Sequence, residues 1–559
     1  MPKRSTSFLI LLIGLILTCS SLLALYLGDV QLSGGKSFTL TTPEGDQLNG
    51  TYYPGKSSAA VLLLEGFGSD QVAMRSLANE FNLAGFHVFS FDFSGQGLSS
   101  GGLSFDYAQT DRLANQVLLV EKNIPLISGQ TNLPLILIGD GLGGRVALQS
   151  AVLDSHLIQG LVLIGPQVNL AANQQAEFFT DTKDTSLPWI QLLKGTVPDT
   201  KILSLSGTLD DILTLDSGSL LLQSLTDDRK ALPGSVITSS ILPSSSREWL
   251  LFPDRVHNFE IYDSHIIAAS LAWSQDILKV NPVAVISPVA EARGWLWILG
   301  ITGIFISGEG ARRAIRHRIH HHHPNLHGVE IANLRRFILS KVLLWLAAVP
   351  FIGIVAGLML IIPLPKPVFN LYYVGFIGGY GLLMLLLYRF GLHPGVYGKL
   401  KFSMILKELA WRRVIITLVF NLAMLAILTL YANSGWYGAP PGGLRLVWAL
   451  IFVPFTALGF WFGHLEIDLI EKKYPDDQIA PVLATLNVLL PFFIYNIVMA
   501  FLGSTSGVIS GLQGLLILAL VLLQGAITYR LTGYRWLTAI LQALMLYLLI
   551  LPTGALFNL

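Results

Sequence analysis

Apolar residues are distributed unevenly along this chain. Residues 8–27 form an apolar run of about twenty residues, which is long enough to cross a hydrocarbon layer ~30 Å thick. From residue 294 onward the chain carries about eight more such runs, of which only the first is clearly shorter than a bilayer. They lie at Trp295–Ser307, Ile338–Ile362, Asn370–Leu387, Val414–Tyr431, Leu446–Phe462, Val482–Leu502, Val508–Tyr529 and Leu537–Leu556. This pattern predicts one N-terminal anchor and a C-terminal all-α polytopic transmembrane domain.

The segment between these runs, residues 36–280, alternates short β-branched runs with helical patterns and glycine-rich turns. Strands are expected at Phe38–Thr41, Gln47–Tyr53, Ala59–Leu64, Phe86–Phe91, Leu161–Ile164, Lys201–Ser206 and Trp249–Phe252, and in the run that begins at Leu135. Helices are expected at Val72–Leu83, Asp106–Glu121, Gly143–Leu153 and Ser264–Leu278. Strands that alternate with helices indicate a doubly wound, mostly parallel sheet with helices on both faces. Residues 169–200 are expected to form a short cap over the sheet, and residues 235–246 a loop.

The chain is therefore predicted to have five parts. Residues 1–7 are a cytoplasmic N-terminus, 8–27 a transmembrane anchor, 36–280 an extracytoplasmic α/β domain, 281–293 a linker and 294–559 the multi-span domain. The anchor exceeds the 7–15 apolar residues usual in a cleaved signal peptide, which favours an uncleaved helix. Its one cysteine, Cys19, is the only one in the chain, so no intramolecular disulfide can form. Thr18 fits poorly before a lipid-attached cysteine.

Composition and charge support a multi-pass protein of the cell membrane. The mean hydropathy is +0.59 and only 13% of residues are charged, values too apolar for a soluble protein. The net charge of +1 gives no indication of a nucleic-acid partner. If each run crosses the membrane in turn, most basic residues fall in loops on the side of the N-terminus, and few beyond Lys366 and Arg445 fall on the other side. The positive-inside rule then places the N-terminus in the cytoplasm and residues 36–280 outside it.

Polar clusters near the predicted spans have simple explanations. His317, His320–His323 and His327 lie in a basic loop that is expected to touch anionic lipid headgroups, although such a tract can also bind metal. Gly353-x-x-x-Gly357 and similar pairs allow close helix approach rather than transport. His464, Glu466, Asp468 and Glu471 follow one span closely and are expected to begin a separate interfacial helix, Leu465–Tyr474. No relay of ionisable groups through several spans is visible.

The sequence Gly139-Asp140-Gly141-Leu142-Gly143 follows the run that begins at Leu135 and precedes a helical pattern. A buried strand that passes through a glycine-rich turn into a helix is the frame of the nucleophile elbow, G-x-S-x-G. Gly141 occupies the position of the serine. Glycine there relieves a strained backbone conformation that costs a side-chain-bearing residue about 1–3 kcal/mol.

Residues 36–280 resemble the α/β-hydrolase superfamily, and most closely the serine-aminopeptidase and monoacylglycerol-lipase-like group. The resemblance is carried, in order, by Thr42-Pro-Glu-Gly-Asp, Glu65-Gly-Phe-Gly, Asp92-Phe-Ser-Gly-Gln-Gly-Leu-Ser, the elbow, Gly207-Thr-Leu-Asp-Asp-Ile and His257. It implies an α/β-hydrolase fold, with Asp210 as the acid and His257 as the base of a degenerate triad whose nucleophile position is Gly141. It also implies an oxyanion hole made by the backbone amides of Phe67 and Leu142. The membrane domain resembles no family that we can name.

Two further departures from the family pattern disfavour acyl transfer. Glu65 replaces the usual strand-end histidine, and Asp140 places a carboxylate beside the elbow, where it would oppose a developing negative charge. Asp210 and His257 are then expected to persist as a hydrogen-bonded pair. Glu65, Asp140 and His257 offer groups that suit divalent ions, but no ligand spacing supports a metal site. We therefore expect neither a metal nor a cofactor.

The sequence favours a non-catalytic binding or regulatory module on a multi-pass membrane domain. The expected partners are membrane lipids, a lipid or peptide ligand in the cleft of the α/β domain, and another membrane protein. One alternative is a membrane-bound esterase, lipase or peptidase with an altered nucleophile or with a water activated by His257. A second alternative is a transporter or lipid-handling domain gated by the α/β domain. Resemblance of fold alone decides between none of them.

Overall fold

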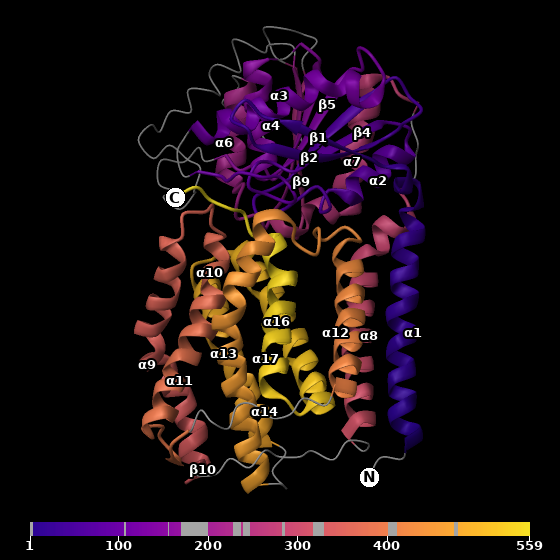
Figure 1. The fold of residues 1–559 in the computed structure, drawn as a ribbon. Coiled ribbons are helices and arrows are strands. Elements are labelled where there is room, and N and C mark those ends of the chain that lie inside the picture. The colour runs from indigo at the N-terminus through magenta and orange to yellow at the C-terminus, as the bar shows by residue number, and fades with distance from the viewer. Residues whose placement is uncertain are drawn as a thin grey trace.

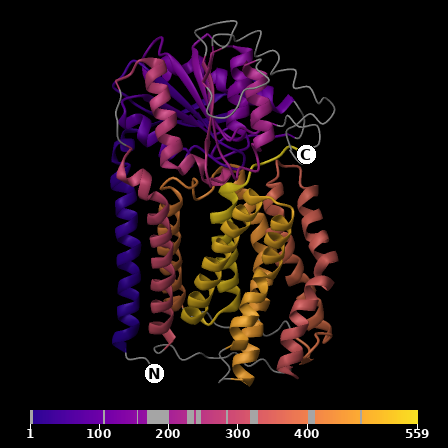
Figure 2. The same ribbon diagram turned by 180° about the vertical axis from the view of Figure 1, so that it is seen from behind.

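The protein is described here from a computed structural model, which describes residues 4–104, 108–154, 156–168, 200–226, 236–238, 246–281, 286–316, 329–400, 411–474 and 479–559. An α/β domain lies on one end of a bundle of long, roughly parallel helices (Figure 1). The C-terminus lies beside the α/β domain, and the N-terminus lies at the opposite end of the bundle. The view from behind shows the same arrangement (Figure 2).

The α/β domain is built on a nine-stranded sheet with the order β1-β2-β4-β3-β5-β6-β7-β9-β8 among the described strands. The strands are β1 (Lys36–Thr41), β2 (Gln47–Tyr53), β3 (Ala60–Leu64), β4 (His87–Phe91), β5 (Leu135–Asp140), β6 (Ile158–Ile164), β7 (Lys201–Gly207), β8 (Val236–Thr238) and β9 (Ser246–Phe252). All pairings from β4 to β9 are parallel, whereas β1, β2 and β8 pair antiparallel with their neighbours. The predicted mostly parallel sheet is confirmed.

Helices cover both faces of this sheet because its central strands are apolar on both sides. The helices are α2 (Arg75–Leu83), α3 (Ala108–Ser128), α4 (Leu142–Leu153), α6 (Leu215–Thr226) and α7 (Ser264–Leu278). Two separate hydrophobic clusters result, one with α3 and α4 and one with α2 and α7. All five residues of β3 and of β4 are buried, as expected for parallel strands between two helix layers.

The structure differs from the local predictions for this domain in three places, at β8, at α6 and at His257. The expected loop at residues 235–246 contains β8, a short edge strand that the serine and proline content concealed. The helix α6 was not predicted, and His257 opens a 3-10 helix, η2 (His257–Tyr262), rather than lying in a loop. The expected cap lies, except for Thr200, outside the described residues.

Nine helices among the described residues are long and apolar enough to cross a membrane. They are α1 (Arg4–Gly28), α8 (Pro288–Arg316), α9 (Leu334–Ile361), the irregular span Val368–Phe390, α12 (Trp411–Ala432), α13 (Gly443–Lys473), the span Ile479–Phe501 made mainly of α14 and α15, α16 (Thr505–Thr532) and α17 (Arg535–Ile550), which continues to Thr553. The predicted fold class, an α/β-hydrolase-like sheet with a polytopic helical domain, agrees with this architecture. The helix α8 begins at Pro288, inside the predicted linker 281–293.

The predicted interfacial helix at Leu465–Tyr474 is wrong, because α13 continues without a break to Lys473. Two acidic residues of this segment, Glu466 and Asp468, are buried against partners from other helices. Glu466 pairs with Lys341 of α9, and Asp468 pairs with Arg535 and accepts a hydrogen bond of 2.6 Å from the hydroxyl of Tyr529. These long-range ion pairs allow the helix to remain inside the protein where the sequence suggested an interface.

The N-terminal helix packs closely against α8 through small residues. A Cβ on Gly14 would overlap the backbone of Ser307, and a Cβ on Gly303 would lie 2.6 Å from the side-chain oxygen of Thr18. Backbones approach this closely only where side chains are small. Removal of α1 as a signal peptide would therefore strip α8 of its main neighbour. Cys19 lies on the exposed side of α1.

The α/β domain is joined to the bundle by buried polar contacts. Arg445, at the start of α13, donates hydrogen bonds to the carbonyl oxygens of Gly97 (2.7 Å), Gly554 (3.0 Å) and Gly95. Its side chain is 2% exposed, so these three carbonyl oxygens replace the water molecules that would otherwise accept its hydrogen bonds. The loop after β4 is thus held directly by a membrane helix.

A second contact at the same interface is an ion-pair cluster. Asp29, at the end of α1, is bound by Arg293 of α8 (2.6 Å) and by Arg75 of α2 (2.9 Å). Arg293 also donates to the carbonyl oxygen of Ser434 at 2.5 Å. The cluster therefore joins two membrane helices, the α/β domain and the loop that follows α12.

The C-terminal tail enters the α/β domain. Two backbone hydrogen bonds hold the tail there. The amide of Leu103 donates to the carbonyl oxygen of Leu556 at 2.8 Å, and the amide of Leu556 donates to the carbonyl oxygen of Gly95 at 2.8 Å. The ring of Phe557 is fully buried in the core that contains α3 and α4. The last membrane helix is consequently tied to the α/β domain by its own extension.

We expect Arg445→Ala to lower the midpoint of thermal unfolding in detergent, because the carbonyl oxygens of Gly97 and Gly554 lose their donor, while that of Gly95 keeps the amide of Leu556. Each unsatisfied acceptor costs about 1–3 kcal/mol, so the total loss should be about 2 kcal/mol or more. Arg412→Ala is the matched control, since Arg412 is exposed on α12. Equal midpoints for the two variants would show that the Arg445 contacts contribute nothing to stability.

Candidate functional site

The elbow between β5 and α4 has the geometry expected for a nucleophile position, but no side chain. Gly141 has φ 48° and ψ −108°, and its amide donates to Ile164 at 2.9 Å. This backbone conformation is strained for any residue with a Cβ. A Cβ built on Gly141 would lie 3.1 Å from His257 Nε2. The imidazole therefore points at the place where a nucleophilic side chain would begin.

His257 lies between two carboxylates. Its Nδ1 is 3.4 Å from Asp210 Oδ2 and 3.5 Å from Glu260 Oε2. Asp210 is fixed by the amides of Ile212 (2.7 Å) and Leu213 (3.0 Å), and Glu260 by the amide of Gly207 (2.5 Å). The structure thus brings the predicted Asp210 and His257 together and adds Glu260, which the sequence analysis did not single out. Its position three residues after His257 was the available signal.

Burial and charge set the protonation of this group. Burial lowers the pKa of His257, but Asp210, Glu260 and Asp140 together outweigh it and raise the pKa well above 6.5. Burial raises the pKa of Glu260 to about 7, although His257 opposes the shift. The imidazolium overcomes the burial of Asp210 and holds the pKa of that carboxyl below its usual range. The acidic neighbours therefore favour the imidazolium form of His257.

Asp210, His257 and Glu260 also form a cluster of a kind that can hold a metal ion, the one found among the described residues. Their three possible ligand atoms all lie within 4.8 Å of one another. A Cβ on Gly165 would lie 2.6 Å from His257 Nδ1, 2.7 Å from Asp210 Oδ2 and closer still to Glu260 Oε2. The three ligand atoms therefore surround a position that Gly165 leaves open because it has no Cβ.

Glu65, which the sequence also offered as a metal ligand, is not part of this cluster. Glu65 is fully buried and accepts hydrogen bonds from the amide of Phe93 and from Gln96, both at 2.9 Å. Gln96 in turn accepts a hydrogen bond of 2.6 Å from the amide of Gly68. The substitution of glutamate for the family's histidine therefore ties the loop after β3 to the loop after β4.

The two amides predicted for the oxyanion hole lie at the ends of β3 and β5. Leu142 is the first residue of α4, where an amide has no acceptor within its own helix. The ring of Phe67 turns towards the membrane domain and packs 5.5 Å from Phe369 and 6.0 Å from Phe557. Asp140 lies close to this region, since a Cβ on Gly66 would be 2.5 Å from its Oδ2, and burial raises its pKa to about 6.

The edge of the sheet that carries the site faces the membrane domain. Residues adjacent to both members of the pair bind α16: Asp211 contacts its first turn, and Asn258 donates to Ser510 at 3.4 Å. Farther along, the hydroxyl of Tyr262 donates to the carbonyl oxygen of Trp436 at 3.4 Å. The site therefore lies at the boundary between the two domains.

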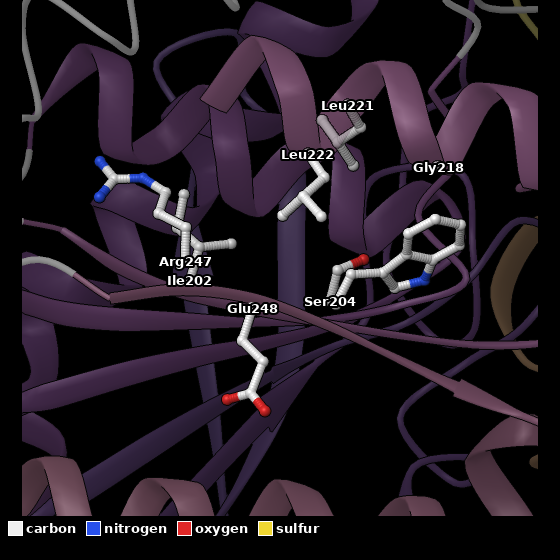
Figure 3. Close-up of a pocket in the computed structure, with 8 residues that line it drawn as sticks. Ile202, Ser204, Gly218, Leu221, Leu222, Arg247 and Glu248 are labelled. Carbon is white, nitrogen blue, oxygen red and sulfur yellow. The ribbon is translucent and has the colours of Figure 1, made fainter. Parts of the chain in front are cut away.

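A small pocket lies elsewhere in the α/β domain, between β7, β9 and α6, and its lining includes Leu222, Arg247 and Trp249. Figure 3 shows Glu248 pointing to the other side of the sheet from Arg247, as alternation along a strand requires. None of the residues that line this pocket belongs to the cluster of Asp210, His257 and Glu260.

The comparisons with known proteins agree with the fold of the α/β domain. Residues 55–232 match the family model described as serine aminopeptidase, S33. The predicted resemblance of the α/β domain to α/β-hydrolases is thus confirmed, and the match does not extend into the membrane domain. In the comparison with curated proteins, none matches this chain.

Several solved structures are similar to the α/β domain. An esterase from Pyrococcus furiosus shares 17% identity with a TM-score of 0.34, over 45% of this chain and 92% of its own. Alpha/beta hydrolase domain-containing protein 10 from mouse shares 15% identity with a TM-score of 0.32, over 44% and 98%. A thermophilic esterase from Thermogutta terrifontis shares 16% identity with a TM-score of 0.30, over 43% and 99%. At these values the similarity says nothing about activity or substrate.

We expect Glu260→Gln to change how stability depends on pH. A carboxyl group whose pKa is raised to about 7 in the folded chain favours folding below its unfolded pKa of about 4.5 and loses that contribution as the pH rises towards 7. The midpoint of thermal unfolding of the wild type, relative to that of Glu260→Gln, should therefore fall between about pH 4.5 and pH 7. A constant difference across this range would contradict the raised pKa.

Proposed function

We propose that this protein is a multi-pass membrane protein whose α/β-hydrolase domain is a non-catalytic binding or regulatory module. The observation that carries the proposal is the elbow, where His257 Nε2 faces a glycine in place of a nucleophile. Without an oxygen or sulfur at Gly141, no acyl-enzyme can form. Loss of the nucleophile lowers the rate of comparable enzymes by about 10⁶-fold.

The charge of the site supports the same proposal. A general base must be unprotonated to accept a proton, but two carboxylates beside Nδ1 favour the imidazolium form of His257. Asp140 adds a third acidic group whose pKa is raised to about 6. A negative charge that develops near the amides of Phe67 and Leu142 would meet this acidic surrounding. Each of these features disfavours water activation as well as acyl transfer.

We further propose that the N-terminus lies in the cytoplasm and the α/β domain outside it. The described basic residues at the helix ends remote from the α/β domain support this orientation. They are Arg312, Arg313, Arg335, Arg336, Arg389, Arg412, Arg413, Lys472, Lys473, Arg530 and Arg535. In this orientation the expected ligand is a lipid or a peptide that reaches the cleft from the outer face of the membrane, and a second membrane protein remains an expected partner.

The first test is labelling of the purified full-length protein with a fluorophosphonate, together with a panel of ester substrates. Wild type should neither label nor hydrolyse. Gly141→Ser should label above neutral pH, where His257 loses its proton and Ser Oγ can displace fluoride from phosphorus. Gly141→Ala is the matched control, since it carries the same backbone strain of about 1–3 kcal/mol without the hydroxyl group.

The effect of Glu260 sharpens this test. In the Gly141→Ser background, Glu260→Gln should shift the onset of labelling to lower pH, because the pKa of His257 falls when one carboxylate is removed. Hydrolysis by the wild type that disappears in His257→Ala would overturn the proposal. The rival function, a membrane-bound hydrolase with an altered nucleophile, would then be preferred.

A further inference from the structure

One membrane helix, α16, is bound by the residues next to both members of the Asp210–His257 pair. Asp211 follows the triad acid directly, and Asn258 follows the histidine. The carbonyl oxygen of Leu209, on the other side of Asp210, accepts a hydrogen bond of 3.2 Å from Thr505. The backbone that positions the pair is thus the backbone that contacts the first turns of α16.

Asp211 acts as a cap supplied to α16 by the other domain. Its carboxylate accepts hydrogen bonds from the hydroxyls of Ser504 (3.0 Å), Thr505 (3.0 Å) and Ser506 (2.8 Å) and from the amide of Ser506 (3.2 Å). The first amides of a helix have no acceptor within it, and its N-terminus attracts negative charge. Ser504 itself caps the amide of Gly507 at 3.1 Å, so Asp211 supplements a cap that is already present.

The far part of α16 carries polar contacts with two other membrane helices. Thr528 accepts a hydrogen bond of 3.1 Å from Asn421 of α12, and Gln524 donates to the same asparagine. Tyr529 donates to Asp468 of α13 at 2.6 Å. A shift of α16 would therefore strain buried polar pairs in the part of the bundle remote from the α/β domain.

We propose that α16 is the element through which the site at Gly141, Asp210 and His257 regulates the membrane domain. This inference rests on the proposed regulatory function of the α/β domain. A ligand that enters beside Gly141 and separates His257 from Asp210 moves the segment Leu209–Asp211. Asp211 then loosens its hold on Ser504–Ser506, and α16 transmits the displacement to Asn421 and Asp468. Asp211 is in this sense a positioning residue.

The test uses the single cysteine of the chain. In a Cys19→Ser background, a reporter cysteine replaces Thr532, which is 2% exposed near the end of α16 remote from the α/β domain. A matched control cysteine replaces Ser340, which is 7% exposed near the corresponding end of α9. The full-length protein is placed in nanodiscs, and the rate of maleimide labelling is measured for each reporter with and without Asp211→Asn or His257→Ala.

Asp211→Asn and His257→Ala should each raise the labelling rate at position 532 by about fivefold or more, the lower end of ordinary couplings between sites. Combining the two substitutions should add little, because both act through one contact. Thr505→Val, which removes one of the hydroxyl donors, should give a smaller rise in the same direction. Labelling at position 340 should remain unchanged in every variant.

Two outcomes would overturn the coupling. Unchanged labelling at position 532 in both Asp211→Asn and His257→Ala would show that the contacts of Asp211 with Ser504–Ser506 are only local packing. An equal rise at positions 532 and 340 would show general loosening of the fold. Neither outcome depends on whether the wild type hydrolyses esters, so failure of the coupling is distinguishable from failure of the proposed function.

Discussion

The insertion of Arg445 into the α/β domain is the contact on which the rest of the arrangement depends. A guanidinium group that is withdrawn from water must find acceptors, and here it finds three backbone carbonyl oxygens of the loop after β4 and of the C-terminal tail. That loop is joined to the loop after β3, which carries Phe67, through the hydrogen bond from the amide of Gly68 to Gln96. One side chain at the start of a membrane helix therefore fixes which edge of the sheet faces the bundle.

This orientation places the candidate site against the membrane domain. The carboxyl ends of parallel strands are where α/β proteins bind ligands, and in this chain that edge is partly occupied by the protein's own membrane domain. Phe369, Phe557 and Ser510 contact residues that flank the degenerate triad. A ligand that reached Gly141 would consequently contact elements of both domains.

Local sequence patterns were enough to predict much of the fold. Gln47–Tyr53 and Ser264–Leu278 were predicted to the residue, because strand alternation and a capping aspartate are local signals; Asp263 accepts from the amides of His265 and Ile266. The elbow, Asp210 and His257 were readable for the same reason. Asp211 and the burial of Arg445 were not, since each depends on a partner distant in sequence. Glu260 was missed although it stands only three residues after its partner His257. The interfacial helix at 465–474 was wrong because pairing with Lys341 and Arg535 keeps Glu466 and Asp468 inside.

Persistence of Asp210 and His257 beside a missing nucleophile needs no catalytic explanation. Removal of one partner from a buried ion pair leaves the other charge uncompensated, which costs about 3–5 kcal/mol and is comparable to the whole stability of many domains. Glycine at position 141 carries no such penalty, since it relieves the strain of φ 48°. Stability therefore constrains Asp210 and His257 but places no such constraint on the residue at position 141.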